Sequence, residues 1–181
     1  MTVLVTGPES SGKSTLARDL AWLLDGLYVP EAARAYLNRN GPTYAEADLP
    51  LIWKAQAEAE DAARASAASC VVCDTGPEVI AVWARVKYGR VPAEVELALR
   101  ERRYDLVLLC APDLPWSPDP LREAPQQEDR RRLFDRYRSA VDGHPQMVTI
   151  SGNARLATAL GAVASLARCG RRGLAAPTRW L

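Results

Sequence analysis

Apolar runs alternate with amphipathic segments along this chain of 181 residues. Short runs rich in Val, Leu, Ile and Cys predict strands at residues 2–6, 27–30, 70–74, 105–110 and 147–150. Helical spacing of the apolar residues between them predicts helices at 13–25, 31–39, 43–68, 77–88, 92–102, 127–141 and 153–168. Apolar strands that alternate with helices are typical of a parallel sheet covered on both faces. The pattern therefore predicts an α/β fold.

Two local signals refine the helix boundaries. Gly26 follows the leucines of the first helix, and we expect it to be the C-terminal cap. Thr43 and Glu46 have the spacing of a capping box, which predicts that the third helix begins there.

The turn after the first predicted strand has the composition of a phosphate-binding loop. Residues 7–14 read Gly-Pro-Glu-Ser-Ser-Gly-Lys-Ser, between an apolar strand and a helix. In such a loop backbone N–H groups surround the β-phosphate, Lys13 reaches the β- and γ-phosphates, and the Ser14 hydroxyl binds Mg²⁺. We therefore expect ATP and Mg²⁺ as cofactors, although the loop does not distinguish ATP from GTP. The nucleotide would contact Gly7, Glu9, Ser10, Ser11, Gly12, Lys13, Ser14 and Thr15.

Polar residues follow two further strands, and ligands bind at the carboxyl ends of parallel strands. Asp74 closes the third strand, where a carboxylate can assist Mg²⁺ binding or simply begin a turn. Glu31 follows the second strand, where it could orient or deprotonate an acceptor hydroxyl or only interact with the helix dipole. Arg34 could hold a phosphate or pair with Glu31. The sequence leaves open whether Glu31 or Asp74 is the base.

A proline-rich segment interrupts the alternation at residues 111–126. Long loops in compact domains are often functional, so we expect a lid at about 111–132 that brings Arg122 to the phosphates as a transition-state clamp. The arginines at 130–132 could join the lid or lie on a solvated helix face. Trp83 and Trp116 could stack on a flat ring, and Trp83 suits the core equally well.

Composition narrows the class of partner. The 23 basic and 22 acidic residues give a net charge of +1, which favours neither nucleic acid nor an anionic membrane as a partner. No apolar run approaches the ~20 residues of a membrane span, and the chain starts with a strand instead of a signal peptide, so we expect a cytoplasmic protein. Cys70 and Cys73 lie three apart on a strand, which indicates core thiols on opposite faces. One histidine, His144, cannot supply a histidine-rich metal site.

Several of these motifs together resemble the ribosylnicotinamide kinase domain of bacterial NAD-biosynthesis regulator proteins, over roughly residues 2–160. The resemblance rests on the phosphate loop, the segments 31–36, 73–75 and 104–116, and the pair Leu121-Arg122. It implies a P-loop fold with strand order 2-3-1-4-5, and transfer of the ATP γ-phosphate to the 5′-hydroxyl of nicotinamide riboside. It also implies that the segment from Gly152 to Arg155 lies near adenine, and that the nucleoside contacts Glu31, Arg34, Tyr36, Asp74, Trp83 and Trp116.

The chain departs from that family at position 76, where members commonly have an aspartate and this chain has Gly76. A kinase for another nucleoside or metabolite is therefore an alternative. A second alternative is an ATP-binding regulatory module that transfers no phosphate and uses the 111–126 loop and the basic tail to bind a protein. We expect a single, stand-alone P-loop kinase domain at residues 1–168 and a basic tail at 169–181, with homo-oligomerisation left open.

Overall fold

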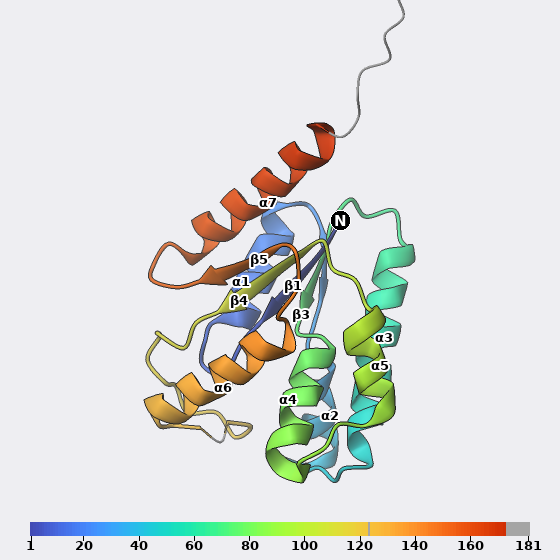
Figure 1. The fold of residues 1–181 in the computed structure, drawn as a ribbon, viewed down its shortest axis with the longest axis vertical. Helices are drawn as coiled ribbons and strands as arrows, with labels where there is room; N and C mark the ends of the chain where they lie inside the picture. Colours follow the sequence, from blue (N-terminus) through green and yellow to red (C-terminus); the bar gives the residue numbers. More distant parts are fainter. Residues whose placement is uncertain (123, 173–181) are drawn as a thin grey trace, which may run out of the picture.

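The protein is built on one parallel five-stranded sheet. The computed structural model describes residues 1–122 and 124–172 (Figure 1). The strands follow the order β2-β3-β1-β4-β5, which confirms the predicted fold class and strand order. Their bounds are β1 (Thr2–Thr6), β2 (Leu27–Val29), β3 (Val71–Asp74), β4 (Leu106–Cys110) and β5 (Met147–Ile150).

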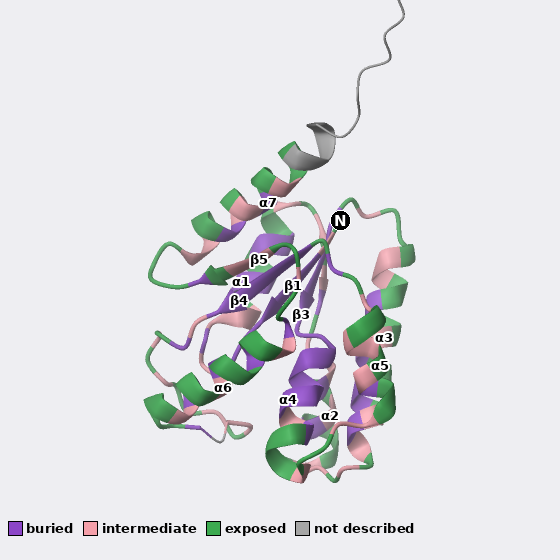
Figure 2. Ribbon diagram, viewed as in Figure 1, coloured by how far each residue is buried: buried purple, intermediate pink, exposed green. Residues whose placement is uncertain are grey.

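Helices cover both faces of this sheet, and the central strands lie fully inside the molecule (Figure 2). One face packs against α1 (Lys13–Leu23) and α7 (Arg155–Arg172). The helices on the other side are α2 (Ala32–Asn40), α3 (Asp48–Ala65), α4 (Pro77–Tyr88), α5 (Ala93–Glu101) and α6 (Gln127–Ala140). Alternate strand residues divide between the two layers: Val3 and Val5 face α1, and Leu4 faces the other layer.

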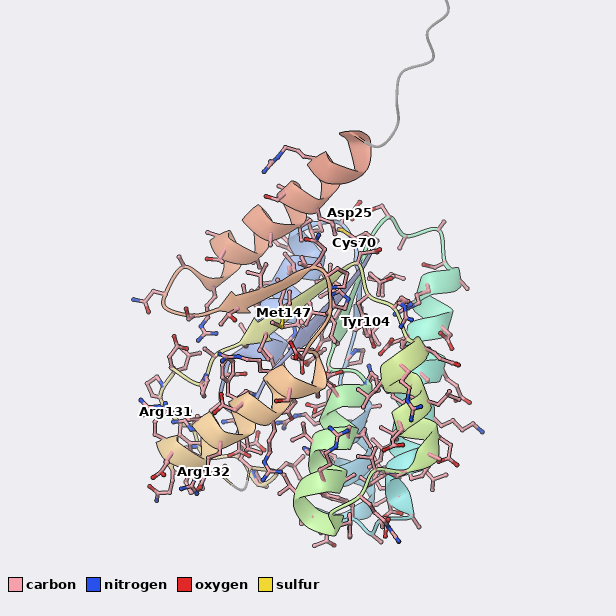
Figure 3. The ribbon with its side chains drawn as sticks, viewed as in Figure 1. Asp25, Cys70, Tyr104, Arg131, Arg132 and Met147 are labelled. Carbon is pink, nitrogen blue, oxygen red and sulfur yellow. The ribbon has the colours of Figure 1, made fainter. Side chains whose placement is uncertain are left out.

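Cys73 of β3 and Cys70, which directly precedes that strand, follow the same alternation. Cys70 packs in the cluster beneath α1 and α7, and Cys73 packs in a cluster on the opposite face, as the sequence predicted. Burial raises the pKa of the Cys70 and Cys73 thiols above their ordinary values. Figure 3 shows Cys70 close to Asp25, where α1 ends. The Cys169 side chain lies outside the described part of the chain.

Two predicted helix boundaries were wrong. The third helix begins at Asp48 and not at residue 43, because the Asp48 carboxylate accepts the Ala45 N–H at 2.7 Å while Glu46 pairs with Arg90 at 2.6 Å. Helix α1 ends at Leu23, and Asp25, with φ 48°, takes the left-handed conformation expected of Gly26. A Cβ at Gly26 would lie 2.8 Å from the Cys70 carbonyl oxygen, so glycine is required there for close packing against β3.

Helix α7 also differs from its prediction, because it continues to Arg172 and so includes the first residues of the expected tail. Residues 173–181, the rest of that tail, lie outside the described residues. Within residues 1–122 and 124–172, no helix combines the length and apolar character that crossing a membrane requires.

Candidate active site

The phosphate loop connects β1 to α1 through backbone conformations that favour glycine. Gly7 has φ 140° and Gly12 has φ 75°. A Cβ at Gly7 would lie 2.5 Å from the Cys110 carbonyl oxygen, so a side chain there would collide with the end of β4. The Gly12 carbonyl accepts the Leu16 N–H at 3.0 Å, which begins α1 immediately after the loop. The N-terminus of α1 therefore lies at the loop, where helix termini bind phosphate.

A cavity of about 700 Å³ extends from this loop past the start of α2 to α4. It brings together side chains that are far apart in the sequence. The sequence-predicted residues on its wall are Glu9, Ser10, Ser11, Gly12, Lys13, Ser14, Thr15, Glu31, Arg34, Trp83 and Arg122.

Glu31 enters this cavity from the N-terminus of α2, directly after β2. Burial raises the pKa of the Glu31 carboxyl above its ordinary value, the Lys13 and Arg34 cations offset part of that rise, and the negative charge of Asp74 adds to it. A carboxyl group whose pKa is raised and which faces a cavity can accept a proton from a bound hydroxyl.

Asp74 lies behind the cavity wall, with 2% of its surface exposed. Its Oδ2 accepts a hydrogen bond from the Tyr28 hydroxyl at 3.0 Å, and its Oδ1 is buried without a hydrogen-bond partner. Burial and the Asp74 charge raise the pKa of Tyr28, so the phenol remains a donor. An unpaired buried carboxylate oxygen fits Mg²⁺ binding through water, with the Ser14 hydroxyl on the cavity wall as a second protein group.

The cavity wall also carries the acidic residues Glu9, Glu31 and Asp129. Among the residues that the structure describes, no group of three or more His, Cys, Asp and Glu side chains is arranged to hold a metal ion. Mg²⁺ is usually bound by one or two protein groups together with water and substrate phosphates, and does not need such a group. Ser14 and Asp74 are therefore the candidate protein groups for Mg²⁺ in this site.

The 111–126 segment crosses the phosphate loop and is bound to it by hydrogen bonds. Glu9 Oε1 accepts the Trp116 Nε1–H at 3.2 Å and the Ala124 N–H at 2.7 Å, while Ser10 Oγ accepts the Ser117 N–H at 3.3 Å. Arg122 lines the cavity and donates through Nη1 to the Ser117 carbonyl. Glu9 and Ser10 of the phosphate loop therefore hold the 111–126 segment in place.

Arg34 forms its ion pair with Asp119 of the 111–126 segment and not with Glu31. Its Nη1 lies 3.0 Å from Asp119 Oδ2. The Leu121 N–H and the Arg34 guanidinium lower the pKa of Asp119 below its ordinary value. This pair joins α2, which begins at Glu31, to the segment that carries Arg122.

The arginines of α6 have different roles. Arg130 is buried and donates to the Leu114 carbonyl at 3.0 Å, which joins α6 to the 111–126 segment. Figure 3 shows Arg131 and Arg132 on α6; Arg131 is exposed, and Arg132 lines the cavity while bonding Glu128 at 2.6 Å. Arg136 also lines the cavity, one turn after Arg132, and was not predicted from the sequence. Its i, i+4 spacing from Arg132 was the available signal.

Besides Gly7 and Asp74, four predicted site residues do not line this cavity. The Tyr36 hydroxyl donates to Asp48 Oδ1 at 2.8 Å, and the Trp116 indole contacts Glu9. Gly152 donates its N–H to Asp113 Oδ2 at 2.6 Å. Arg155 donates to the Ser11 carbonyl at 3.0 Å, to the Ala111 carbonyl at 3.2 Å and to Asp113 Oδ1. Arg155 therefore ties the phosphate loop to the end of β4.

Aromatic side chains form the end of the cavity farther along α4. Tyr44 and Trp83 stack with ring centroids 5.1 Å apart, and Lys87 Nζ lies 3.8 Å from the centroid of Tyr44. Lys87 and the Tyr88 hydroxyl also donate to the Tyr44 carbonyl, at 2.8 and 2.9 Å. Tyr44 was not predicted as a site residue, because its segment was interpreted as a capping box. The sequence periodicity also gives no signal that would place a loop residue against α4.

Gly76 marks a close approach between the end of β3 and the core. A Cβ at this position would lie 2.6 Å from Tyr104 Oη and 2.8 Å from Glu78 Oε2. A side chain at position 76 would therefore point inward, toward Tyr104 and Glu78, and not into the cavity.

The chain is similar in sequence to proteins of NAD biosynthesis. It is 31% identical over 136 residues to the Escherichia coli K12 "trifunctional NAD biosynthesis/regulator protein NadR", covering 73% of this chain and 33% of that protein. The chain thus spans about a third of the length of the curated relatives it matches.

Solved structures show the same fold. A NadR structure in complex with NAD and AMP-PNP aligns with a TM-score of 0.72 at 21% identity, over 99% of this chain and 51% of that one. A NadR complex with NR aligns with a TM-score of 0.70 at 22% identity, over 91% and 51%. The family model described as "AAA domain" matches residues 2–157, and this chain therefore belongs to the AAA domain family.

Proposed function

We propose that this protein is an ATP- and Mg²⁺-dependent kinase that phosphorylates the 5′-hydroxyl of nicotinamide riboside to give nicotinamide mononucleotide. The observation that carries the proposal is a single cavity whose wall includes the phosphate loop, Glu31 and the stacked rings of Tyr44 and Trp83. The 31% identity to relatives named for NAD biosynthesis supports this choice of acceptor.

Phosphoryl transfer needs cations around the γ-phosphate and an acceptor held in line. Lys13 and the loop amides would hold the β- and γ-phosphates, and Arg122 would offset the charge that develops on the transferred group. Ser14 and Asp74 would hold Mg²⁺, which neutralises phosphate charge when bound. Arg132 and Arg136 add positive charge to the same cavity.

Glu31 is the better candidate for the base. It lines the cavity, and its pKa is raised by burial, whereas Asp74 lies behind the wall with one oxygen already bonded to Tyr28. Glu31 would accept the proton of the 5′-hydroxyl as that oxygen attacks the γ-phosphorus and the bond to the ADP oxygen breaks.

The aromatic end suits a flat, positively charged ring. Aromatic faces carry negative partial charge and attract cations, and because Lys87 lies over Tyr44, Trp83 is the candidate ring for the ligand. The nicotinamide ring of the riboside is a pyridinium cation, so stacking on Trp83 would combine apolar contact with this attraction.

The test is a competition between acceptors. Purified protein is incubated with Mg²⁺-ATP and an equimolar mixture of nicotinamide riboside, ordinary nucleosides and deoxynucleosides, and the products are identified by mass. Lys13→Ala is the matched control, because it removes a phosphate ligand from the cavity wall and not from the core.

We expect nicotinamide mononucleotide as the dominant product of the wild type and none from Lys13→Ala. Another monophosphate as the main product would refute the acceptor and retain the kinase. Absence of any phosphorylated product would favour the regulatory ATP-binding alternative.

A further inference from the structure

A buried amide joins the two backbone segments that carry the candidate carboxylates. Gln56 of α3 is 3% exposed, and it does not line the cavity. Its Oε1 accepts the Ala32 N–H at 2.8 Å, one residue after Glu31. Its Nε2 donates to the Thr75 carbonyl at 3.2 Å, one residue after Asp74. One side chain therefore spans the ends of β2 and β3.

Both backbone groups need this partner. Ala32 is the first residue of α2, so its N–H has no acceptor within the helix. Thr75 has φ 70°, an unfavourable conformation for a β-branched residue that persists only where its surroundings hold it. Its N–H donates to the Val5 carbonyl at 2.9 Å, and Gln56 holds its carbonyl.

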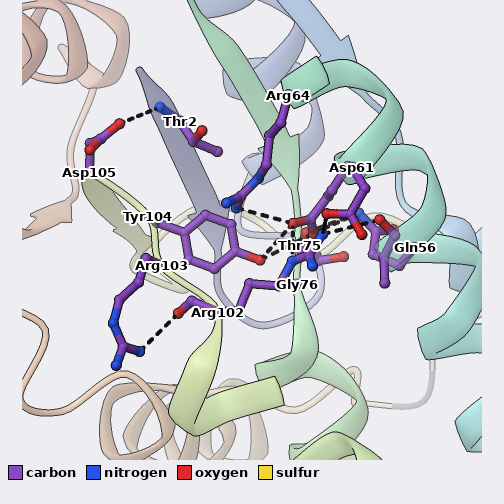
Figure 4. A network of polar contacts seen from close by, with 12 residues as sticks. Thr2, Gln56, Asp61, Arg64, Thr75, Gly76, Arg102, Arg103, Tyr104 and Asp105 are labelled. Atoms are coloured by element: carbon purple, nitrogen blue, oxygen red, sulfur yellow. Dashed lines mark hydrogen bonds and ion pairs between the residues drawn. The ribbon is translucent and has the colours of Figure 1, made fainter. Parts of the chain in front are cut away.

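A buried network behind Gln56 fixes the direction of the amide (Figure 4). Gln56 Nε2 lies 3.4 Å from Glu60 Oε1, and a carboxylate only accepts, so the NH₂ group must face Glu60 and Thr75. Glu60 in turn accepts from Arg102 Nε at 2.8 Å, from the Tyr104 hydroxyl at 3.0 Å and from Arg64 Nη2 at 3.4 Å. The Gln56 oxygen is thereby directed at Ala32.

We propose that Gln56 is a positioning residue of the phosphoryl-transfer site, which sets the placement of Glu31 relative to Asp74 by linking the Ala32 N–H to the Thr75 carbonyl. The role of the two carboxylates rests on the proposed function. The link itself is a property of the fold, and it can be tested without an acceptor.

Gln56→Leu removes both hydrogen bonds at similar volume. Small misplacements of catalytic groups lower rates by up to about 10²-fold, so we expect kcat to fall about 10- to 100-fold while the KM for ATP changes less than about twofold. Ile52→Val is the matched control, because Ile52 is buried on the same helix and contacts none of these polar groups through hydrogen bonds. It should lose stability and keep its kcat.

Gln56→Glu supplies a pH readout that a purely structural role would not give. An ionised carboxylate cannot donate to the Thr75 carbonyl, whereas the protonated acid can both donate and accept. The groups facing the introduced carboxyl are Glu60, which favours its protonation, and, through Glu60, Arg64, Arg102 and Tyr104. The ratio of variant to wild-type kcat should therefore rise as pH falls from 8 to 6.

The acceptor-independent measurement is the titration of the Glu31 carboxyl, followed by ¹³C NMR in the free protein. Lys13, Arg34, Asp74 and Asp119 are the charged groups that act on Glu31. Loosening the link should expose Glu31 and lower its pKa toward the ordinary value in Gln56→Leu, and leave it unchanged in Ile52→Val.

The two proposals fail in different ways. A wild type that phosphorylates no nucleoside would refute the proposed function, and the titration would still decide the role of Gln56. A Gln56→Leu protein with wild-type kcat and an unchanged Glu31 titration would overturn the positioning role. If Gln56→Leu does not fold, a kcat ratio for Gln56→Glu that does not vary with pH would overturn it instead.

Discussion

The hydrogen bonds of Glu9 predict how firmly the 111–126 segment, our proposed lid, is held against the phosphate loop. Glu9→Ala removes the acceptor of both the Trp116 indole and the Ala124 N–H. Hydrogen bonds to a charged group contribute about 1.5–3 kcal/mol, and the lower value applies because Glu9 is only half-buried. Two bonds then amount to about 3 kcal/mol, and at about 1.4 kcal/mol per tenfold change the lid should open about 10²-fold more often.

Hydrogen exchange at the Ser117 amide measures this opening. Ser117 keeps its bond to Ser10 Oγ in Glu9→Ala, so faster exchange of its N–H reports lid opening and not the loss of its own partner. Glu9→Gln retains a neutral acceptor and should accelerate exchange only about tenfold. Glu58→Ala, which removes an exposed ion pair with Lys54 on α3, is the control and should leave Ser117 unchanged. Exchange in Glu9→Ala within twofold of the wild type would refute the reasoning.

Three further predictions follow from individual side chains. Arg122→Ala should lower kcat by about 10²-fold or more, because Arg122 would act on the transition state; an unchanged steady-state kcat would transfer that role to Arg132 or Arg136. Gly76→Ala should lower the free energy of unfolding by about 1–3 kcal/mol, because the added Cβ would collide with Tyr104 and Glu78. Gly161→Ala has no neighbour within 4 Å and should stabilise α7. Equal effects of the two substitutions in urea denaturation would contradict the prediction. Burial raises the pKa of Glu78 to about 7. Between about pH 4.5 and 7 the native state therefore binds one proton more than the unfolded state. The free energy of unfolding should fall by about 3 kcal/mol as pH rises through that range. Glu78→Gln should remove this pH dependence of stability. If its denaturation curves kept the wild-type pH slope, Glu78 would not be the source of that slope.

The sheet and the phosphate loop were predictable because their signals are local. Apolar runs such as 106–110 are continuous where both faces of a strand are buried, and the glycines at positions 7 and 12 mark required backbone conformations. Glu31 and Asp74 were found by their positions at strand ends, which a parallel sheet brings to one edge.

Residues that act through tertiary contacts were not predictable in this way. Gln56 lies in an alanine- and glutamate-rich helix whose sequence resembles a solvated surface, yet it is buried against residues 24 positions earlier and 19 later. Tyr44 reaches the cavity because its segment packs against α4, and Arg136 reaches it because α6 packs beside the cavity. The ligand-binding roles predicted for Tyr36 and Arg155 rested on the family resemblance. In the structure the Tyr36 hydroxyl donates to Asp48, and Arg155 donates to the Ser11 carbonyl.

The most direct test of the central claim is whether ADP formation depends on nicotinamide riboside. ADP release from Mg²⁺-ATP is measured with and without the riboside, in the wild type and in Lys13→Ala. The account predicts slow release alone, strong stimulation by the riboside with one nicotinamide mononucleotide formed per ADP, and neither in the variant. ADP release that the riboside does not change, or that Lys13→Ala retains, would contradict it.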